Sequence, residues 1–177
     1  MKFHDTGLEG AFIIELDRLQ DSRGFFARTW CQKEFQDQGL ISTIAQANTS
    51  FNNKAGTLRG MHYQAEPYQE TKLVRCTSGA LYDVIIDLRP QSATYRRWFG
   101  AELTAENGKM LYVPADFAHG FITLKDNTEV HYLVSEFYTP GAERGVRWND
   151  PAFAIEWPQA VEVISEKDAA WPDFADM

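Results

Sequence analysis

The stretch Leu81-Tyr82-Asp83-Val84-Ile85-Ile86-Asp87-Leu88 carries the clearest fold signal in this chain of 177 residues. Its aliphatic and aromatic residues favour a β-strand, and a run this apolar is typical of a strand in the core. Only Asp83 and Asp87 interrupt it, and each must point either into the interior or out toward solvent. The residues before it, 72–77, form a second β-prone run that ends at the turn Ser78-Gly79.

Further strands are predicted on both sides of this pair, at intervals near ten residues and with turn residues between them. They cover 98–103, 109–113, 120–124 and 129–137 downstream, and 11–14, 25–30, 41–50 and 56–64 upstream. Helical periodicity is confined to 33–39, where Gly39 is a candidate C-cap, and to the segment after Ser165. This pattern indicates an all-β sandwich or barrel.

The composition limits the class of protein further. A hydrophobic fraction of 44% and an aromatic fraction of 14% are enough for a packed core, and residues 1–177 show no repeat or boundary, so we expect one domain. The net charge of −8 argues against a nucleic-acid surface. We find no signal peptide or apolar run of membrane-spanning length, and only Cys31 and Cys76, so we expect a soluble cytoplasmic protein without membrane partners.

The stretch Gly56–Gln64 is where the chemistry is expected. It places a cation, an imidazole and an amide at Arg59, His62 and Gln64, and its two glycines allow sharp bends or a close approach of the backbone to a ligand. From this stretch alone, His62 is either a hydrogen-bonded structural residue or a catalytic one.

Other candidates have similar alternatives. His119, in a turn that begins at Pro114 and leads into a strand, either faces a ligand or caps the backbone. Arg23 and Arg59 each lie next to a glycine, where a guanidinium suits two phosphate oxygens, although a surface ion pair is the simpler interpretation.

A lysine in a strand raises a further question. Either Lys72 and Val74 or Leu73 and Arg75 must face inward, and a buried lysine needs a partner because an unpaired buried charge is costly. A metal held by His62 and His119, with Glu66 or Glu70, is a minor alternative because the spacing of these residues is not typical of a metal site.

With these residues gathered, the chain resembles the dTDP-4-dehydrorhamnose 3,5-epimerase family, the RmlC-like branch of the cupins. The segments that carry the resemblance span nearly the whole chain in the family's order: Asp21–Phe26, Gln46–Ser50, Leu58–Gln64, Lys72–Arg75, Tyr82–Val84, Pro114–Phe121, Arg147–Pro151 and Ser165–Asp168. The resemblance implies a cupin-type jelly-roll β-barrel with a few short peripheral helices, usually a homodimer, that needs no metal or other cofactor. It also implies a nucleotide-linked 4-keto-6-deoxyhexose as substrate, inverted at C3, C5 or both.

The resemblance assigns roles to individual residues. His62 matches the family's base, Asp168 its carboxylate partner, Lys72 the cation for the developing enolate and Tyr132 the acid on the opposite face, which are groups that such proton transfers require. Substrate contacts are expected at Arg23, Phe26, Arg28, Gln46, Asn48, Ser50, Arg59, Asp83, His119, Tyr138, Glu143 and Lys167.

The chain departs from the family's usual pattern around the ligand. Arg28 replaces a common glutamate, the Ser50–Gly56 loop is one residue longer, Glu70-Thr71 replaces Gln-Gly, and Asp116 replaces a glycine. These departures leave two alternatives open. One is the same fold acting on a different nucleotide sugar, as a single epimerase or an isomerase, and the other is a non-catalytic cupin that binds sugar nucleotides.

Overall fold

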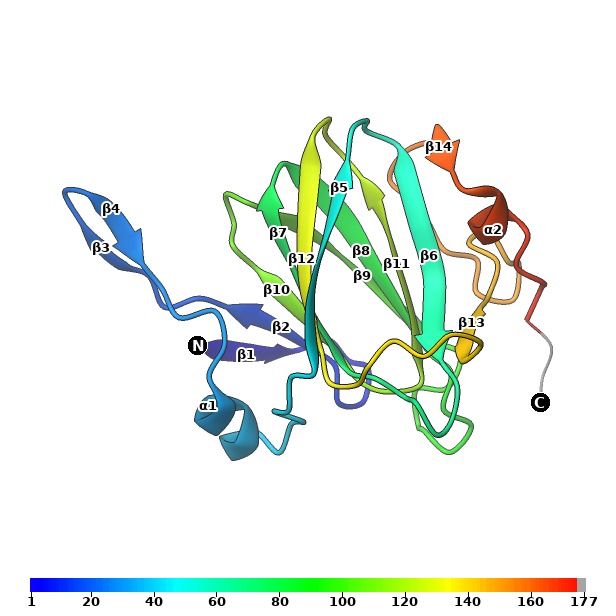
Figure 1. Cartoon of the computed structure of the whole chain (residues 1–177), viewed down its shortest axis with the longest axis horizontal. Coiled ribbons are helices and arrows are strands. Elements are labelled where there is room, and N and C mark those ends of the chain that lie inside the picture. The colour runs from blue at the N-terminus through cyan, green and yellow to red at the C-terminus, as the bar shows by residue number, and fades with distance from the viewer. Residues whose placement is uncertain (175–177) are drawn as a thin grey trace.

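The computed structural model describes residues 1–174, which form two antiparallel sheets packed face to face and a projecting hairpin (Figure 1). The first sheet has the order β1-β2-β10-β7-β12-β5, formed by Lys2–Asp5, Phe12–Glu15, Met110–Val113, Lys72–Ser78, Thr128–Val134 and Gln46–Asn52. The second has the order β13-β6-β11-β8-β9, formed by Glu143–Gly145, Thr57–Gln64, Phe117–Thr123, Ala80–Asp87 and Trp98–Thr104, and β14 (Val163–Ile164) pairs with β6 in parallel. The predicted fold class, a jelly-roll β-barrel with short peripheral helices, is confirmed.

The main core lies between the two sheets and follows the two-residue periodicity of the strands. Val74 and Cys76 of β7 meet Leu81 and Ile85 of β8 there, all fully buried. Because Asp83 and Asp87 alternate with the same set, they also face the interior, and both are fully buried. The mostly apolar stretch 81–88 therefore brings two acids into the interior.

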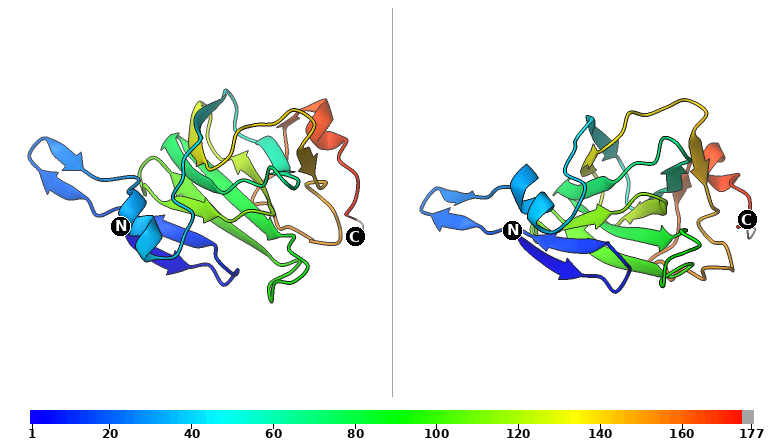
Figure 2. Two further views of the ribbon diagram at one scale, coloured as in Figure 1. Left: turned by 60° about the horizontal axis from the view of Figure 1, so that its bottom comes forward. Right: turned by 90° about the horizontal axis from the view of Figure 1, so that it is seen from below.

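Smaller clusters cover the outer faces of both sheets. Phe35 of helix α1 (Gln32–Asp37) packs on Ile14 and Tyr112 outside the first sheet. Outside the second sheet, Phe153 of the C-terminal segment packs on Val84 and its neighbours. β8 is therefore covered on both faces, which accounts for its many apolar residues. The C-terminal segment is held against β6 by the pairing of β14 with that strand (Figures 1 and 2).

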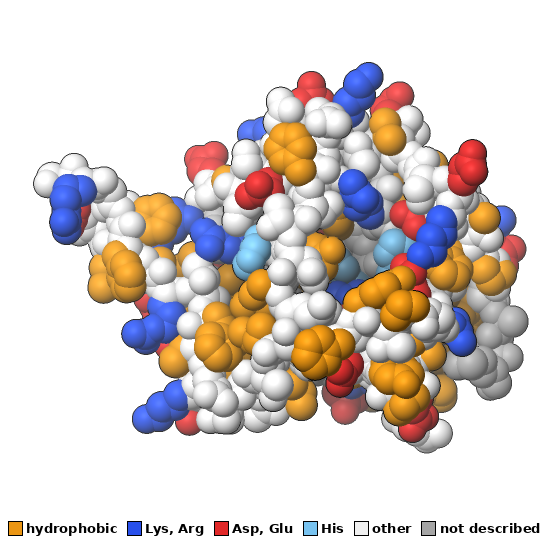
Figure 3. All heavy atoms as spheres, in the orientation of Figure 1, with side chains coloured by type: hydrophobic (Ala, Val, Ile, Leu, Met, Phe, Trp, Pro, Cys, Tyr) orange, Lys and Arg blue, Asp and Glu red, His pale blue; other side chains and the backbone are white. Residues whose placement is uncertain are grey.

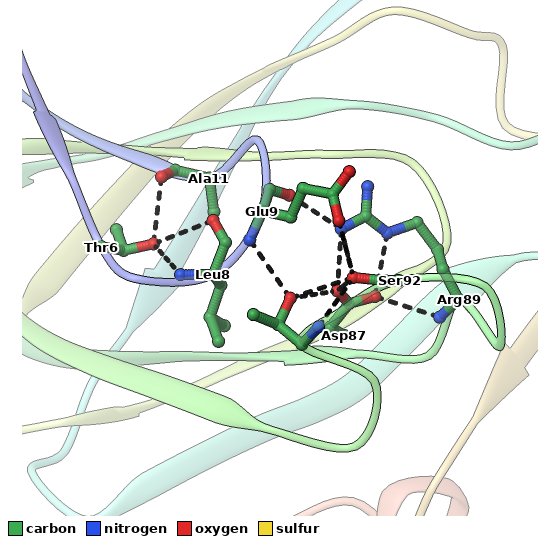
Figure 4. Close-up of polar contacts among 8 residues, drawn as sticks. Thr6, Leu8, Glu9, Ala11, Asp87, Arg89 and Ser92 are labelled. Carbon is green, nitrogen blue, oxygen red and sulfur yellow. Dashed lines mark hydrogen bonds and ion pairs between the residues drawn. The ribbon is translucent and has the colours of Figure 1, made fainter.

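Asp87 ties two loops together at one end of the barrel (Figure 4). It accepts hydrogen bonds from Arg89, Ser92 and Thr94, and Arg89 also donates to the backbone carbonyl of Glu9. Burial, the largest influence, raises the pKa of Asp87, but these hydrogen bonds outweigh it and hold the pKa below its ordinary value.

Several predicted boundaries need correction. The strand predicted at 25–30 ends at Phe26, because β4 (Gly24–Phe26) pairs only with β3 (Leu19–Asp21) in a hairpin that projects from the body (Figure 2). Residues 41–45 are not a strand, and β5 begins at Gln46. β11 begins at Phe117, three residues before the predicted start, so His119 lies within a strand and not in a turn.

The predicted helices are present. Gly39 follows α1 in the left-handed region, with φ of 71°, as a C-terminal glycine does. Ser165 caps α2 (Glu166–Ala169) by accepting a hydrogen bond from the Asp168 N–H. No helix among residues 1–174 is both long enough and apolar enough to cross a membrane.

Candidate active site

Two adjoining cavities open on one face of the barrel, where Figure 3 shows a hollow with histidine and basic side chains at its edge. The first, of about 180 Å³, is lined by Ser50, Arg59, His62, Lys72, His119, Phe121, Tyr132 and Asp168. The second, of about 280 Å³, is lined by Gln46, Asn48, His62, Tyr63, Gln64, Glu70, Lys72, Tyr132, Val134, Tyr138 and Glu143. His62, Lys72 and Tyr132 line both, so the two cavities meet at these three side chains.

The strand register explains which side chains reach the cavities. On β7, Lys72 lines the cavity and Val74 lies in the core, whereas Leu73 packs in the cluster outside the sheet. The question about the inward face of this strand is therefore settled in favour of Lys72. β5 alternates in the same way, so that Gln46, Asn48 and Ser50 line the cavities.

His62 is held by the carboxylate of Asp168, which comes from the C-terminal helix α2. The His62 Nε2 lies 2.7 Å from Asp168 Oδ1, and the other carboxylate oxygen accepts a hydrogen bond of 3.4 Å from the Gly60 N–H. A carboxylate at Nε2 favours the tautomer with the proton on that nitrogen, which leaves a lone pair on Nδ1. Burial, the largest influence, raises the pKa of Asp168, but the bonds from His62 and Gly60 outweigh it and hold the pKa below its ordinary value.

Gly60, one of the two glycines of the 56–64 stretch, allows a close approach between two strands. Gly60 has φ of 140°, and a Cβ at this position would lie 2.5 Å from the Cα of Gly120 on β11. The two strands therefore approach each other more closely here than side chains would permit. The register shifts between His119 and Phe121, next to this contact. Glycine thus sets the spacing of the strands that carry His62 and His119.

His119 also has a carboxylate partner. Its Nε2 lies 2.6 Å from Asp83 Oδ1, and Asp83 is fully buried, with its Oδ2 lacking a hydrogen-bond partner among the described residues. The side chain of His119 is 11% exposed, against 28% for His62. His62 is therefore the histidine that a ligand in the cavity can reach more easily.

Lys72 and Tyr132 complete the wall shared by both cavities. The Lys72 ammonium donates to the backbone carbonyl of His62 at 3.3 Å and lies 3.3 Å from Glu70 Oε1. Burial raises the pKa of the Tyr132 phenol, while nearby Arg59 lowers it and Glu70 raises it, with a net increase. The phenol is consequently protonated at neutral pH and able to donate.

Polar residues surround the outer cavity. The Tyr138 N–H donates to Gln46 Oε1 at 2.7 Å, and the Lys167 ammonium of α2 donates to Glu143 of β13. The bond to Glu143 raises the pKa of Lys167. Arg59, at the inner cavity, is exposed and donates to Asn52 Oδ1 at 2.8 Å. The buried hydroxyl of Ser50 beside it has no partner among residues 1–174.

Five of the predicted substrate contacts line neither cavity within the same chain. Asp83 is fully buried and bonded to His119, and Lys167 pairs with Glu143, which lines the outer cavity.

The other three lie in the N-terminal part of the chain, away from the cavities. Arg23 and Phe26 lie on the projecting hairpin, where Arg23 pairs with Asp21 and the Phe26 side chain is exposed. Arg28 pairs with Glu34 of α1 at 3.3 Å. The charge change at Arg28, which raised doubt about the ligand, is therefore outside the cavity formed by its own chain.

Several residues at the cavities were not among the predicted catalytic residues or substrate contacts. Glu70, Tyr63 and Phe121 line the cavities, and the ring of Trp171 lies edge-on to His62, with centroids 6.1 Å apart. Glu70 lies in the loop before β7, so strand alternation did not place it beside Lys72, and Trp171 had no local signal either.

The surroundings of His62 and His119 bear on the alternative of a metal site. His62 and His119 are each bonded to a carboxylate, and no group of three His, Cys, Asp or Glu side chains within residues 1–174 is arranged to hold a metal ion. The arrangement suits proton transfer instead. It combines a histidine with a free Nδ1, a neutral tyrosine on the opposite sheet and a lysine beside both.

Comparison with known proteins agrees with this chemistry. Residues 5–176 match the family model described as dTDP-4-dehydrorhamnose 3,5-epimerase. The chain is 42% identical over 182 residues to the dTDP-4-dehydrorhamnose 3,5-epimerase of Sinorhizobium fredii, covering 100% of this chain and 91% of that protein.

Two solved structures of related epimerases are also similar to this chain. The dTDP-4-dehydrorhamnose 3,5-epimerase of Bacillus anthracis, with TDP and PPi bound, has a TM-score of 0.94 at 40% identity, covering 98% of this chain and 99% of that one. The dTDP-6-deoxy-D-glucose-3,5-epimerase of Legionella pneumophila, in complex with dTDP-4-keto-L-rhamnose, has a TM-score of 0.91 at 34% identity, with 97% and 92% covered.

Proposed function

Because this chain belongs to the dTDP-4-dehydrorhamnose 3,5-epimerase family, we propose that it inverts C3 and C5 of a dTDP-linked 4-keto-6-deoxyhexose in deoxysugar biosynthesis, as dTDP-rhamnose formation requires. The chain is an epimerase of the isomerase class. The observation that carries the assignment of residues is that His62 of one sheet, paired with Asp168 of α2, and Tyr132 of the other sheet line the same cavity.

Both C3 and C5 lie next to the C4 ketone, so their C–H bonds are weakly acidic. In the proposed step, His62 Nδ1 takes the proton from carbon, and the electron pair moves into the C4 carbonyl to form an enolate. Asp168 stabilises the imidazolium that results. The Lys72 ammonium stabilises the enolate oxygen where negative charge develops.

Inversion requires that the proton return from the other face of the sugar ring. Tyr132 is on β12 of the first sheet, whereas His62 is on β6 of the second, so the acid and the base approach the cavity from opposite walls. The buried phenol donates its proton to carbon as the enolate collapses back to the ketone. Proton exchange with solvent then restores both groups.

The remaining predicted contacts are assigned by position. Ser50, Arg59 and His119 line the inner cavity and would contact the sugar and the diphosphate, and the buried Asp83 would act through His119. Gln46, Asn48, Tyr138 and Glu143 line the outer cavity and would contact the nucleotide, and Lys167 would reach it beside Glu143. The relatives with TDP or a dTDP-sugar bound support this choice of nucleotide.

We further propose that the enzyme is a homodimer in which the β3–β4 hairpin of one copy reaches the cavity of the other. The hairpin projects from the body in every view (Figures 1 and 2). It exposes Leu19, Phe25 and Phe26, at 68%, 50% and 67%, which is unusual for three large apolar side chains on a short hairpin. A second copy would cover them and would bring Arg23, Phe26 and Arg28 to the nucleotide.

Two further proposals complete this assignment. We propose that residues 1–177 act as one domain, because the C-terminal segment completes the site by supplying Asp168. We place the enzyme in the cytoplasm, without nucleic-acid or membrane partners. Its two cysteines are unpaired, which is usual in a reducing compartment, and its net charge is −8.

The test follows solvent deuterium into C3 and C5 of a dTDP-4-keto-6-deoxyhexose by NMR. The wild-type protein should label both carbons, and His62→Ala should abolish labelling at both. His4→Ala, at an exposed strand position, is the matched control and should leave labelling unchanged. Undiminished exchange in His62→Ala would exclude His62 as the base, and an absence of exchange in the wild type would exclude the reaction.

The choice of nucleotide can be tested separately, by melting temperature. Ligand binding to the folded state raises the melting temperature, so dTDP should raise it more than GDP or CDP at equal concentration. A larger rise with GDP or CDP would favour the alternative substrate class.

A further inference from the structure

Glu70 lies beside the proposed catalytic groups, and the mechanism above gives it no role. It is in the loop between β6 and β7, two residues before Lys72, and it lines the outer cavity. Its side chain is only 13% exposed, and its Oε1 lies 3.3 Å from the Lys72 ammonium. An acid in a cavity for an anionic nucleotide sugar is unfavourable unless it serves another group.

The surroundings of Lys72 indicate which group it serves. The Lys72 side chain is 10% exposed, and its ammonium has three N–H donors. One donor goes to the backbone carbonyl of His62, and Glu70 is the neighbouring anion. These two partners hold the ammonium from two directions, and a third direction remains for a ligand in the cavity.

The other acidic side chains at or near the cavities each bond to a different residue. Asp168 holds His62, Asp83 holds His119, and Glu143 holds Lys167. Glu70 is therefore the one acid that the described residues place beside Lys72 in an ion pair.

We propose that Glu70 is a positioning residue for the epimerisation, which fixes the Lys72 ammonium against the His62 carbonyl so that it faces the enolate oxygen. This inference rests on the proposed function. A lysine has a long and flexible side chain, and holding it in one place before the reaction removes part of the entropy cost of stabilising the enolate. The benefit appears in the transition state, where the oxygen becomes negative, more than in substrate binding.

Glu70 also affects Tyr132, the proposed proton donor. The other ionisable residues that line the cavities with Tyr132 are Arg59, His62 and Tyr63 of β6, Glu70, Lys72 of β7, His119 of β11, Tyr138, Glu143 of β13 and Asp168 of α2. Within this set Glu70 raises the pKa of Tyr132, and Arg59 lowers it. Neutralising Glu70 therefore lowers the pKa of the phenol, and the alkaline limb of the rate profile should move to lower pH.

The test compares two variants of Glu70 with a control variant of Glu66. Glu70→Gln keeps the shape and removes the charge, and we expect kcat to fall about tenfold, within the range of couplings between contacting residues, with KM nearly unchanged. Glu70→Asp keeps the charge and should recover part of kcat. Glu66→Gln, at an exposed acid of the same loop, should match the wild type.

A double-mutant cycle separates positioning from a loss of fold. In a Lys72→Gln background, Glu70→Gln should have little further effect on kcat, because the group that it positions is gone. An unchanged kcat and pH profile in Glu70→Gln, a change in KM alone, or full additivity in the cycle would each overturn the inference. If the wild type shows no proton exchange at all, the proposed function fails instead.

Discussion

His62 on β6 lies directly opposite His119 on β11, and each imidazole is hydrogen-bonded through Nε2 to its own carboxylate. The two carboxylates differ in origin. Asp83 belongs to the neighbouring strand β8, so its position is part of the barrel, whereas Asp168 comes from a helix of the C-terminal segment. The pair at His62 therefore depends on how that segment docks, and this dependence can be tested.

Replacing Asp168 by Asn keeps the side-chain shape but removes the charge that orients His62. We expect kcat to fall about a hundredfold or more, because an amide no longer favours the reactive tautomer or stabilises the imidazolium. The measurement is the rate of deuterium entry at C3 and C5. Asp173→Asn is the control, since Asp173 is an exposed acid of the same segment that pairs with Arg147. A rate near wild type in Asp168→Asn would contradict the orienting role.

The same carboxylate should make stability depend on pH. The pKa of Asp168 is lower in the folded protein than its ordinary value of 3.8. Its contribution to stability is therefore complete above that value and is lost as the pH falls through the lower folded pKa. Melting temperatures of the wild type and of Asp168→Asn should differ most near neutral pH and converge below about pH 4. A constant difference down to about pH 2 would be evidence against the lowered pKa.

The proposed exchange of hairpins predicts complementation between two inactive variants. Arg23→Ala damages the hairpin and His62→Ala damages the barrel, so each homodimer should be impaired. A mixed dimer contains one cavity with an intact barrel and an intact hairpin. After subunit exchange, about a quarter of the cavities should be intact, and activity should rise to that level. No recovery, with exchange confirmed by mass spectrometry, would indicate that the hairpin does not serve the partner.

Asp87 should matter for stability and not for catalysis. Replacing it by Asn weakens the bonds to Arg89, Ser92 and Thr94 and leaves a partly buried guanidinium without its anion. We expect the free energy of unfolding to fall by about 2 kcal/mol, measured by urea denaturation. At a temperature where the variant is folded, kcat should equal that of the wild type. A large loss of kcat there would connect this network to the site.

Much of the fold could be predicted from the sequence, because the pattern of apolar residues along each strand matches the side chains that are buried. The run at 81–88 has apolar residues on both faces, interrupted only by Asp83 and Asp87, and the structure covers both faces of β8. The ends of strands were harder to predict. The pattern at 25–30 favours a strand, but residues after Phe26 have no partner strand in the projecting hairpin.

The site was predictable only in part. His62 and Lys72 lie on predicted strands, but the pattern left open which face of the Lys72 strand points inward, and only the structure shows it. The contact of His62 with Asp168 joins residues 106 positions apart, and no local signal specifies it, so only the resemblance indicated it. Arg23 and Phe26 illustrate the opposite case, because sequence similarity assigns them to the ligand while their own chain holds them away from its cavity.

The docking of α2 beside β6 also has a consequence during protein synthesis. Ribosomes add roughly 5 to 20 residues per second, so Asp168 follows His62 by about 5 to 20 seconds. On the proposed mechanism, every nascent chain in that interval carries the base without its orienting acid, and translation through Asp168 sets the earliest moment at which catalysis begins.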